Sequence, residues 1–262
     1  MVPSFVGRRV DAVSDGTDYS TYLKIDDLLT LQQTLTPGAA DELLFIVVHQ
    51  SYELWFKLII DEVGRAIASL EKSEPWLALP PLRRSVEIED LLLKHLDVLE
   101  TMSPEGFLEF RDPLHPASGF QSVQFRAIEF LSGEGKEAML NFELFDNEQK
   151  AWLKDISLRP TLWDGFCQSL GADKTNSAAV LEALRQLYHD HKDAERSALH
   201  AVAEVLVDHD ERIALWRHRH MLMAGREIGR RPGTGGSEGM AYLSTTIGQR
   251  FYPLLWEVRS SL

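Results

Sequence analysis

Apolar residues recur along most of the chain at the three- and four-residue spacing of helices. Runs that alternate between apolar and polar residues, which would indicate strands, do not stand out. We therefore expect an all-α fold, a single-domain bundle of long helices. The spacing predicts helices over the following ranges, of which the last two overlap and can form one continuous helix: 26–36, 40–70, 82–102, 120–131, 147–156, 177–189, 194–219 and 215–228.

The segment around His49 is the longest nearly uninterrupted apolar stretch. On a helix, Phe45, His49, Tyr52 and Phe56 fall on one face. A buried imidazole costs free energy unless a partner forms a hydrogen bond with it. A core histidine bonded to a neighbouring carbonyl is the simpler interpretation of this segment alone, and a functional histidine against an aromatic wall is the other.

Length and charge limit the classes of protein to consider. The 262 residues, 44% of them hydrophobic, suffice for one large core. We expect a single domain over residues 1–262, with residues 1–18 poorly ordered or extended as an arm. The net charge of -13 repels the phosphate backbone, so we expect no nucleic-acid partner.

The single cysteine, Cys167, excludes an intrachain disulfide and fits a reducing cytoplasm as a small buried side chain. Residues 1–18 lack the apolar stretch of a signal peptide. Lys57 and Asp61 interrupt the longest apolar run, so we expect no membrane span. These features predict a cytoplasmic protein.

Histidines and glycines are the first candidates for chemistry. No histidine has a glutamate three positions before it, which disfavours a helical di-iron site. We interpret Asp208-His209-Asp210, in a charged stretch, as a solvated helix face. The glycine-rich residues 233–239 lack the lysine of a phosphate-binding loop. Their glycines favour a close approach of the backbone to another group, with a plain connector as the alternative.

Two arginines, Arg111 and Arg126, are candidates for binding a carboxylate, since a planar guanidinium pairs with it through two hydrogen bonds. By itself, Arg111 is more readily explained as a surface ion-pair partner. A heme would require an axial nitrogen on a rigid element with apolar walls. Composition does not choose between His218 and His220 for that ligand.

Three ordered motifs together closely resemble the tryptophan 2,3-dioxygenase family. They are Phe110-Arg111-Asp112, the segment from Pro116 to Ser122, and the segment from Trp216 to Gly239. The resemblance extends from about Tyr19 to near Trp256. Members of this family are heme enzymes, so the resemblance implies heme b with its iron as cofactor and O2 as co-substrate. It implies insertion of O2 into the indole of L-tryptophan, which cleaves C2–C3 and gives N-formylkynurenine.

The resemblance also assigns roles to residues. His220 corresponds to the axial ligand of the heme iron. In the family, the axial histidine precedes the loop threonine by the same number of residues that separates His220 from Thr234. His49 corresponds to the distal, catalytic histidine that reaches the indole N–H, and Ser118 to a serine near the heme. Arg111 corresponds to the residue that binds the substrate carboxylate, while Thr234 binds the ammonium and carboxylate end as its loop closes.

The remaining assignments concern the walls of the pocket and the assembly. Phe45 and Phe107 resemble residues that line the indole pocket. Tyr19, Tyr22 and Leu23 resemble a segment that enters the active site of a neighbouring subunit in a homotetramer. Without the resemblance, this segment would be an aromatic anchor for a chain terminus.

Some positions depart from the family's pattern, namely Pro113, Gly225, Pro232 and Glu238. None of them removes a matched site residue, but all can reshape the pocket or its loop. Two alternatives therefore stand beside a tryptophan dioxygenase. One is a heme-dependent monooxygenase or dioxygenase of a substituted indole in a secondary-metabolite pathway. The other is a heme-binding sensor without turnover.

Overall fold

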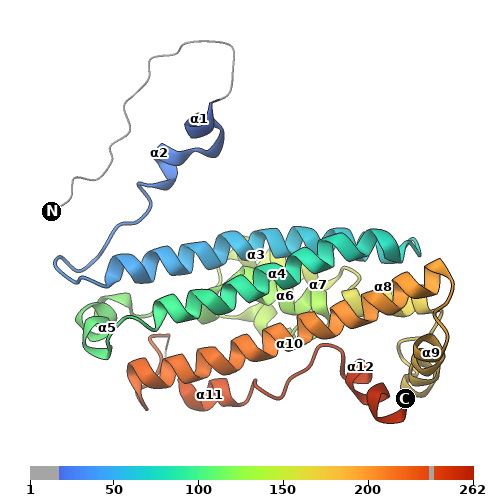
Figure 1. Cartoon of the computed structure of the whole chain (residues 1–262). Helices are drawn as coiled ribbons and strands as arrows, with labels where there is room; N and C mark the ends of the chain where they lie inside the picture. Colours follow the sequence, from blue (N-terminus) through green and yellow to red (C-terminus); the bar gives the residue numbers. More distant parts are fainter. Residues whose placement is uncertain (1–17, 236–238) are drawn as a thin grey trace.

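The chain is described by a computed structural model that covers residues 18–235 and 239–262. All regular elements of these residues are helices, which confirms the all-α prediction (Figure 1). Expectations about residues 1–17 and Glu238 lie outside the described residues. The α-helices are α1 (Tyr19–Leu23), α2 (Ile25–Leu28), α3 (Glu42–Leu70), α4 (Pro75–Leu99), α5 (Pro104–Arg111), α6 (Val123–Ser132), α7 (Asn147–Ser157), α8 (Leu162–Leu170), α9 (Ser177–His189), α10 (Ala194–Ile228), α11 (Met240–Ser244) and α12 (Pro253–Val258), with short 3-10 turns η1 (Asp112–Leu114), η2 (Gly119–Gln121), η3 (Glu137–Asn141) and η4 (Arg259–Ser261).

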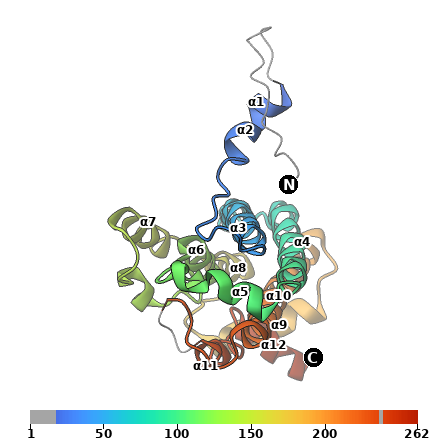
Figure 2. The ribbon, with the colours of Figure 1, turned by 90° about the vertical axis from the view of Figure 1, so that its left-hand side faces the viewer.

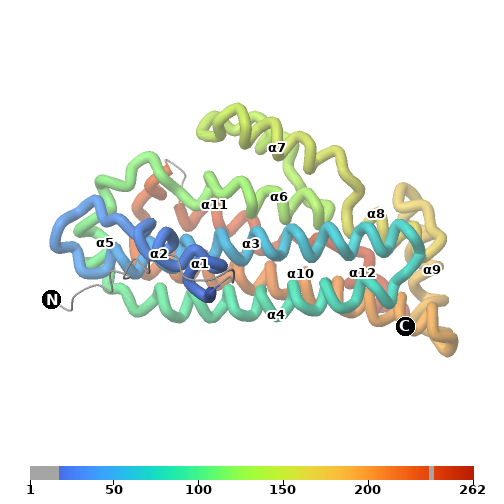
Figure 3. The backbone as a smooth tube through the Cα atoms, turned by 90° about the horizontal axis from the view of Figure 1, so that it is seen from above, coloured from blue at the N-terminus to red at the C-terminus, as the bar shows by residue number. Residues whose placement is uncertain are grey.

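Three long helices, α3, α4 and α10, form the frame of the bundle and lie side by side (Figures 1 and 3). The 35 residues of α10 span about 50 Å at the helical rise of about 1.5 Å per residue. Helices α6 and α8 pack against α3, and α7 packs outside α6 (Figure 2). The core includes the fully buried side chains Ile59, Leu70, Leu82, Leu96, Phe110, Ile128, Leu153, Phe166 and Leu184. Cys167 is also buried, as expected.

Most predicted helices are confirmed. The helix at 177–189 has the predicted bounds, and the two overlapping predictions at the C-terminal end form the single helix α10. Helix α4 begins at Pro75 rather than at 82, with Pro80 and Pro81 inside it. Each internal proline removes one backbone hydrogen bond. Burial of Ala78, Pro81 and Leu82 in the bundle offsets that loss.

The predicted helix over 26–36 is wrong, because α2 ends at Leu28 and an irregular segment follows. Side chains of α3 bind the backbone of that segment instead. The buried Glu42 carboxylate accepts hydrogen bonds from the backbone N–H groups of Leu35 and Thr36 at 2.7 and 2.8 Å. Gln50 Nε2 donates to the Leu31 carbonyl at 3.1 Å. These bonds satisfy backbone groups that a helix would otherwise pair internally.

Helix α3 is long and apolar enough to cross a membrane by length and composition. The expectation that Lys57 and Asp61 would disqualify it was therefore too strict. Core helices of bundles meet the same criteria, and α3 packs against α4, α6 and α8 in this one.

The interpretation of Asp208-His209-Asp210 as a solvated face is wrong for two of its three residues. Only Asp208 is exposed, whereas His209 and Asp210 are buried. His209 Nδ1 lies 2.6 Å from the Glu89 carboxylate, and its Nε2 lies 2.9 Å from the Ser132 hydroxyl. This contact set joins α4, α6 and α10 in the middle of the bundle.

Asp210 fixes the C-terminal segment to α10. Its carboxylate accepts hydrogen bonds from the Phe251 backbone N–H at 3.0 Å and from Trp256 Nε1 at 2.8 Å. A buried carboxylate is tolerated only with such donors. The charged appearance of the 208–210 segment therefore hides two buried anchoring groups.

We expect the Glu89–His209 pair to resist the loss of either partner alone. His209→Ala should lower the free energy of unfolding of the heme-free protein by about 3–5 kcal/mol, because it leaves a buried carboxylate unpaired. The double variant E89L/H209L should lose less free energy of unfolding than the sum of the losses in E89L and H209L alone. Urea unfolding curves measure both. Additive losses would contradict direct coupling, and D208A is the exposed control, with a change within about 0.5 kcal/mol.

Candidate functional site

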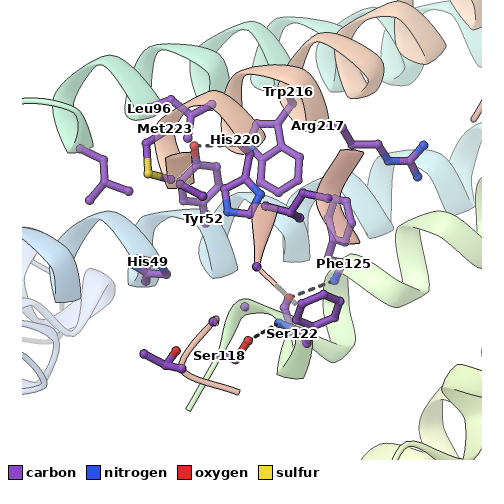
Figure 4. A pocket seen from close by; sticks show the side chains of 18 of the residues that line it. His49, Tyr52, Leu96, Ser118, Ser122, Phe125, Trp216, Arg217, His220 and Met223 are labelled. Atoms are coloured by element: carbon purple, nitrogen blue, oxygen red, sulfur yellow. Dashed lines mark hydrogen bonds between the residues drawn. The ribbon is translucent and has the colours of Figure 1, made fainter. Parts of the chain in front are cut away.

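A cavity of about 260 Å³ opens between α3, α5, α6, α10 and α11 (Figure 4). Its walls are mostly aromatic and aliphatic: Tyr52, Phe56, Leu96, Leu99, Met102, Phe125, Trp216, Met223 and Ile228. The cavity also collects seven residues that the sequence had singled out from five separate segments: Phe45, His49, Phe107, Arg111, Ser118, His220 and Thr234. Such an apolar cavity with a few convergent polar groups is the usual form of a small-molecule site.

His49 lies on α3 and its imidazole is held by its own helix. Its Nδ1 lies 2.7 Å from the Phe45 carbonyl oxygen, one turn earlier. A carbonyl only accepts hydrogen bonds, so Nδ1 carries the proton and Nε2 is left as an acceptor. Burial lowers the pKa of His49, which keeps the ring neutral at neutral pH. His49 thus bonds a neighbouring carbonyl, as the simpler interpretation expected, and it also lines the cavity. Its functional role stays a prediction.

The structure distinguishes His218 from His220, the two histidines between which composition did not choose. His218 is exposed, whereas His220 lines the cavity. The His220 ring stacks on Trp216, with centroids 5.0 Å apart and planes 14° from parallel. Burial, with a smaller effect of His49, lowers the pKa of His220 to about 4. The imidazole is therefore neutral, as a metal ligand must be.

Arg111, at the end of α5, reaches the glycine-rich loop. Its Nη2 donates to the Pro232 carbonyl at 2.7 Å. Pro232, one of the positions that depart from the family's pattern, therefore contacts this arginine directly. The Nε atom of Arg111 is buried and has no hydrogen-bond partner in the described part of the chain. An arginine with one edge anchored and a donor left over is suited to bind an anion.

The two loops rich in glycine and proline pack against each other. Thr234 Oγ1 donates to the Ala117 carbonyl at 2.6 Å. A Cβ atom on Gly235 would lie 2.5 Å from the Ser118 Cβ, so only glycine allows this approach. Ser118 itself caps η2, where its hydroxyl accepts from the Phe120 N–H. Residues 233–235 of this loop therefore pack closely at the cavity wall, which is more than a plain connector requires.

An aromatic group stands beside His49. The Phe45 ring lies 4.0 Å from the His49 ring, 5.8 Å from Phe107 and 5.5 Å from Phe110, measured between centroids. Phe110 does not line the cavity itself but is fully buried behind Phe45 and Phe107. This arrangement can receive the flat face of an aromatic substrate.

The structure does not bring Tyr19, Tyr22 and Leu23 to the cavity of their own chain. They lie on α1 and are 74%, 74% and 42% exposed. Helices α1 and α2 project away from the bundle (Figures 1 and 2). Large exposed apolar side chains on a projecting segment are unusual for a protein that acts as a single chain.

The cavity residues fit an iron porphyrin. His220 supplies one neutral nitrogen donor on the long, rigid α10, and aromatic and aliphatic side chains enclose it. Cationic side chains at the cavity walls, Arg111, Arg126 and Arg217, can pair with carboxylates. This is the donor set that a b-type heme requires.

Comparison with known proteins decides the family. A family model described as tryptophan 2,3-dioxygenase matches residues 6–157 and 169–262 of the chain. The chain belongs to the tryptophan 2,3-dioxygenase family. This confirms the resemblance, and it makes the protein an oxidoreductase of a family that oxidises tryptophan to N-formylkynurenine.

Relatives of this family match nearly the whole chain. The tryptophan 2,3-dioxygenase of Nocardioides sp. is 45% identical over 253 residues, which are 93% of this chain and 94% of the relative. Those of Herpetosiphon aurantiacus and Caulobacter vibrioides are each 38% identical and cover 95% and 93% of this chain, and 100% and 98% of their own lengths.

The lowered pKa of His220 predicts the acid sensitivity of the heme-free protein. The unfolded chain, with a histidine pKa near 6.5, binds more protons than the folded chain between that pH and about 4. The free energy of unfolding should therefore fall as the pH decreases through this range, by up to roughly 1.4 kcal/mol per pH unit. Above the range, His220 is neutral in both the folded and the unfolded chain, so it should cause no loss of stability.

Urea unfolding at a series of pH values measures this slope. His220→Phe should reduce it, because the phenyl ring can stack on Trp216 without titrating. His218→Gln, two residues earlier on the exposed face, is the matched control and should leave it unchanged. An unaltered slope in the phenylalanine variant would contradict a neutral, buried His220.

Proposed function

We propose that the cavity is the active site of a heme-dependent tryptophan 2,3-dioxygenase whose substrate is L-tryptophan. The observation that carries this proposal is the meeting of three groups in one cavity. These are the His220 imidazole, the acceptor nitrogen of His49 and the Arg111 guanidinium. An indole without a carboxylate would need no such arginine.

His220 would hold the iron of heme b through its imidazole. When bound, the heme supplies the chemistry that activates O2. Trp216 fixes the orientation of the His220 ring, because the two rings stack. Trp216 is itself held by a hydrogen bond from its Nε1 to the Tyr52 hydroxyl at 3.4 Å. Tyr52 in turn donates to the Leu92 carbonyl at 2.7 Å, which fixes this support to α4.

His49 orients the indole. Its Nε2 accepts a hydrogen bond from the indole N–H, since its Nδ1–H already donates a hydrogen bond to the Phe45 carbonyl. Phe45 and Phe107 then bound the ring, with Phe110 behind them. A neutral His49 in this position can also take up the indole proton at Nε2 as the ring is oxidised.

Arg111 and Thr234 hold the amino-acid end. The free Nε of Arg111 is available for the substrate carboxylate while Nη2 keeps its bond to the Pro232 carbonyl. Thr234, two residues further along the same loop, offers a hydroxyl to the ammonium and carboxylate groups. Packing of this loop on Ala117 and Ser118 excludes water from the reacting ring.

The assembly is proposed to be a cytoplasmic homotetramer in which α1 reaches the active site of a neighbouring subunit. The exposure of Tyr19, Tyr22 and Leu23 supports a partner for this segment. The bundle also exposes apolar side chains in two stripes: Leu43, Val47 and Leu54 on α3, and Leu77, Leu91 and Val98 on α4. Contact with other subunits would bury both features.

Removal of the Arg111 guanidinium should affect substrates according to their charge. Arg111→Gln should raise the KM for L-tryptophan roughly 10- to 100-fold, because a charge-assisted hydrogen bond to the carboxylate is lost. Turnover of tryptamine, which lacks the carboxylate, should change little. Steady-state kinetics on both substrates measure the difference, with the R219Q variant of an arginine outside the cavity as control. An equal rise for both substrates would count against a carboxylate contact.

Labelled O2 tests the reaction itself. With reduced, heme-loaded protein and ¹⁸O2, mass spectrometry should find two labelled atoms in ring-opened product from L-tryptophan. His220→Ala should lose heme or activity, because no other described histidine of α10 lines the cavity. One labelled atom, or turnover of simple indoles alone, would favour oxygenation of a different indole. A Soret shift with tryptophan but no product would favour a sensor.

A further inference from the structure

Three charged side chains form a buried cluster where α6 and α10 meet the cavity. Arg126 Nη1 donates to Glu129 Oε2 at 2.6 Å, and Arg217 Nη2 donates to Glu129 Oε1 at 3.0 Å. The side chains of Arg126, Glu129 and Arg217 are 12%, 7% and 5% exposed. All three line the cavity. The carboxylate therefore holds two guanidinium groups in fixed positions.

Arg126 is left with one unused edge. Its Nε is buried and has no hydrogen-bond partner within residues 18–235 and 239–262. Nε and Nη2 together form the edge of the guanidinium opposite the one that Glu129 occupies through Nη1. The group lies over the Phe125 ring, 4.9 Å from its centroid, which limits its movement. A buried donor without a partner costs free energy unless a ligand satisfies it.

Charged side chains of both signs lie at this wall of the cavity. Arg126, Arg217 and Lys136 all line the cavity, and Glu129 is the carboxylate between the two arginines. Glu134 also lies near Arg217, but burial raises the pKa of its carboxyl, which makes it a weaker counter-charge. The buried Asp210 carboxylate is a further negative charge near Arg217 and Glu134. An anionic ligand is therefore favoured by the Nε of Arg126, which is unpaired among the described residues, and not by the net charge of the wall.

The position of Arg126 separates it from the amino-acid end of the site. Phe125, beneath Arg126, packs 5.0 Å from Trp216, and Trp216 stacks 5.0 Å from His220, between ring centroids. Arg126 thus belongs to the His220 side of the cavity. Arg111, in contrast, is bonded to the glycine-rich loop at Pro232. One amino-acid substrate has one carboxylate, which Arg111 accounts for.

We infer that Arg126, positioned by Glu129 and Arg217, is a second carboxylate-binding residue of the cavity and takes a carboxylate of the porphyrin cofactor. The inference rests on the proposed heme-dependent function. Heme b carries two carboxylates, and the unpaired Nε of Arg126, together with Nη2, is suited to bind one of them through two hydrogen bonds. Glu129 and Arg217 orient this edge without needing to touch the ligand.

The experiment compares heme with its dimethyl ester, in which both carboxylates are blocked. Each is loaded into the full-length protein, and its loss to excess apomyoglobin is followed by the Soret absorbance. In Arg126→Gln, heme should be lost roughly ten-fold faster than in the unaltered protein, while loss of the ester should not change. The unaltered protein should itself release the ester faster than heme.

Two further variants make the comparison specific. R219Q removes an arginine of α10 that is ion-paired with Asp97 and Glu100 outside the cavity, and it should change neither rate. R126K keeps the charge but not the planar fork, so its heme loss should lie between the unaltered protein and R126Q. If R126Q does not fold, as judged by circular dichroism, R126K and the ester comparison in the unaltered protein decide the question.

The results that would overturn the inference are distinct from one another. Equal acceleration of heme and ester loss would mean that Arg126 only supports the fold. Unchanged heme loss with a weakened Kd for L-tryptophan but not for tryptamine would assign Arg126 to the substrate carboxylate. A protein that shows no Soret band with heme would overturn the proposed function too. Heme binding without any preference over the ester would overturn this inference alone.

Discussion

The uninterrupted course of α10 is the constraint on which the rest of the structure depends. One helix of 35 residues carries the buried His209 and Asp210, the cavity-lining Arg217 and the ligand candidate His220. Because these side chains share one rigid element, their relative positions follow from helical geometry. Each upstream anchor to α4, α6 or the C-terminal segment therefore also fixes where the His220 imidazole lies.

The same helix explains why polar groups are concentrated where they are. Glu89, Ser132 and Glu129 are contributed by α4 and α6, and each contacts a polar side chain of α10. An apolar bundle can slide or rotate at little cost, whereas hydrogen bonds between buried groups are satisfied in one register only. We regard these contacts as the devices that align α6 with α10, so that the cavity between them has one shape.

Much of the fold could be predicted from the sequence, because helical periodicity and end signals are local. The bounds 177–189 follow from spacing alone, whereas the spacing left open whether 194–219 and 215–228 form the one helix that α10 is. Helix α8 was missed although Thr161 and Asp164 form a capping box and Gly171 ends it, since its apolar run is only nine residues long. The helix expected over 26–36 fails for a non-local reason, the carboxylate of Glu42 on another element.

The site shows the same division. Resemblance brought together His49, Arg111, Ser118, His220 and Thr234, and these all line one cavity. Local sequence could not reveal that His209 and Asp210 are buried, because a charged run looks solvated until its partners on other helices are known. Nor could it show that the buried Nε of Arg126 has no hydrogen-bond partner among the described residues, since that depends on which atom of the guanidinium binds Glu129.

If Arg111 binds the substrate carboxylate as proposed, its bond to the Pro232 carbonyl joins substrate recognition to loop geometry in a single guanidinium. Linkage then works in both directions. An anion that fixes the guanidinium also stabilises this position of the loop, and a change that displaces Pro232 weakens the anion's affinity by the same factor. On this proposal, the two loops and the arginine form one thermodynamic unit. Residues that do not touch the substrate, such as Gly235 against Ser118, would then contribute to its selection.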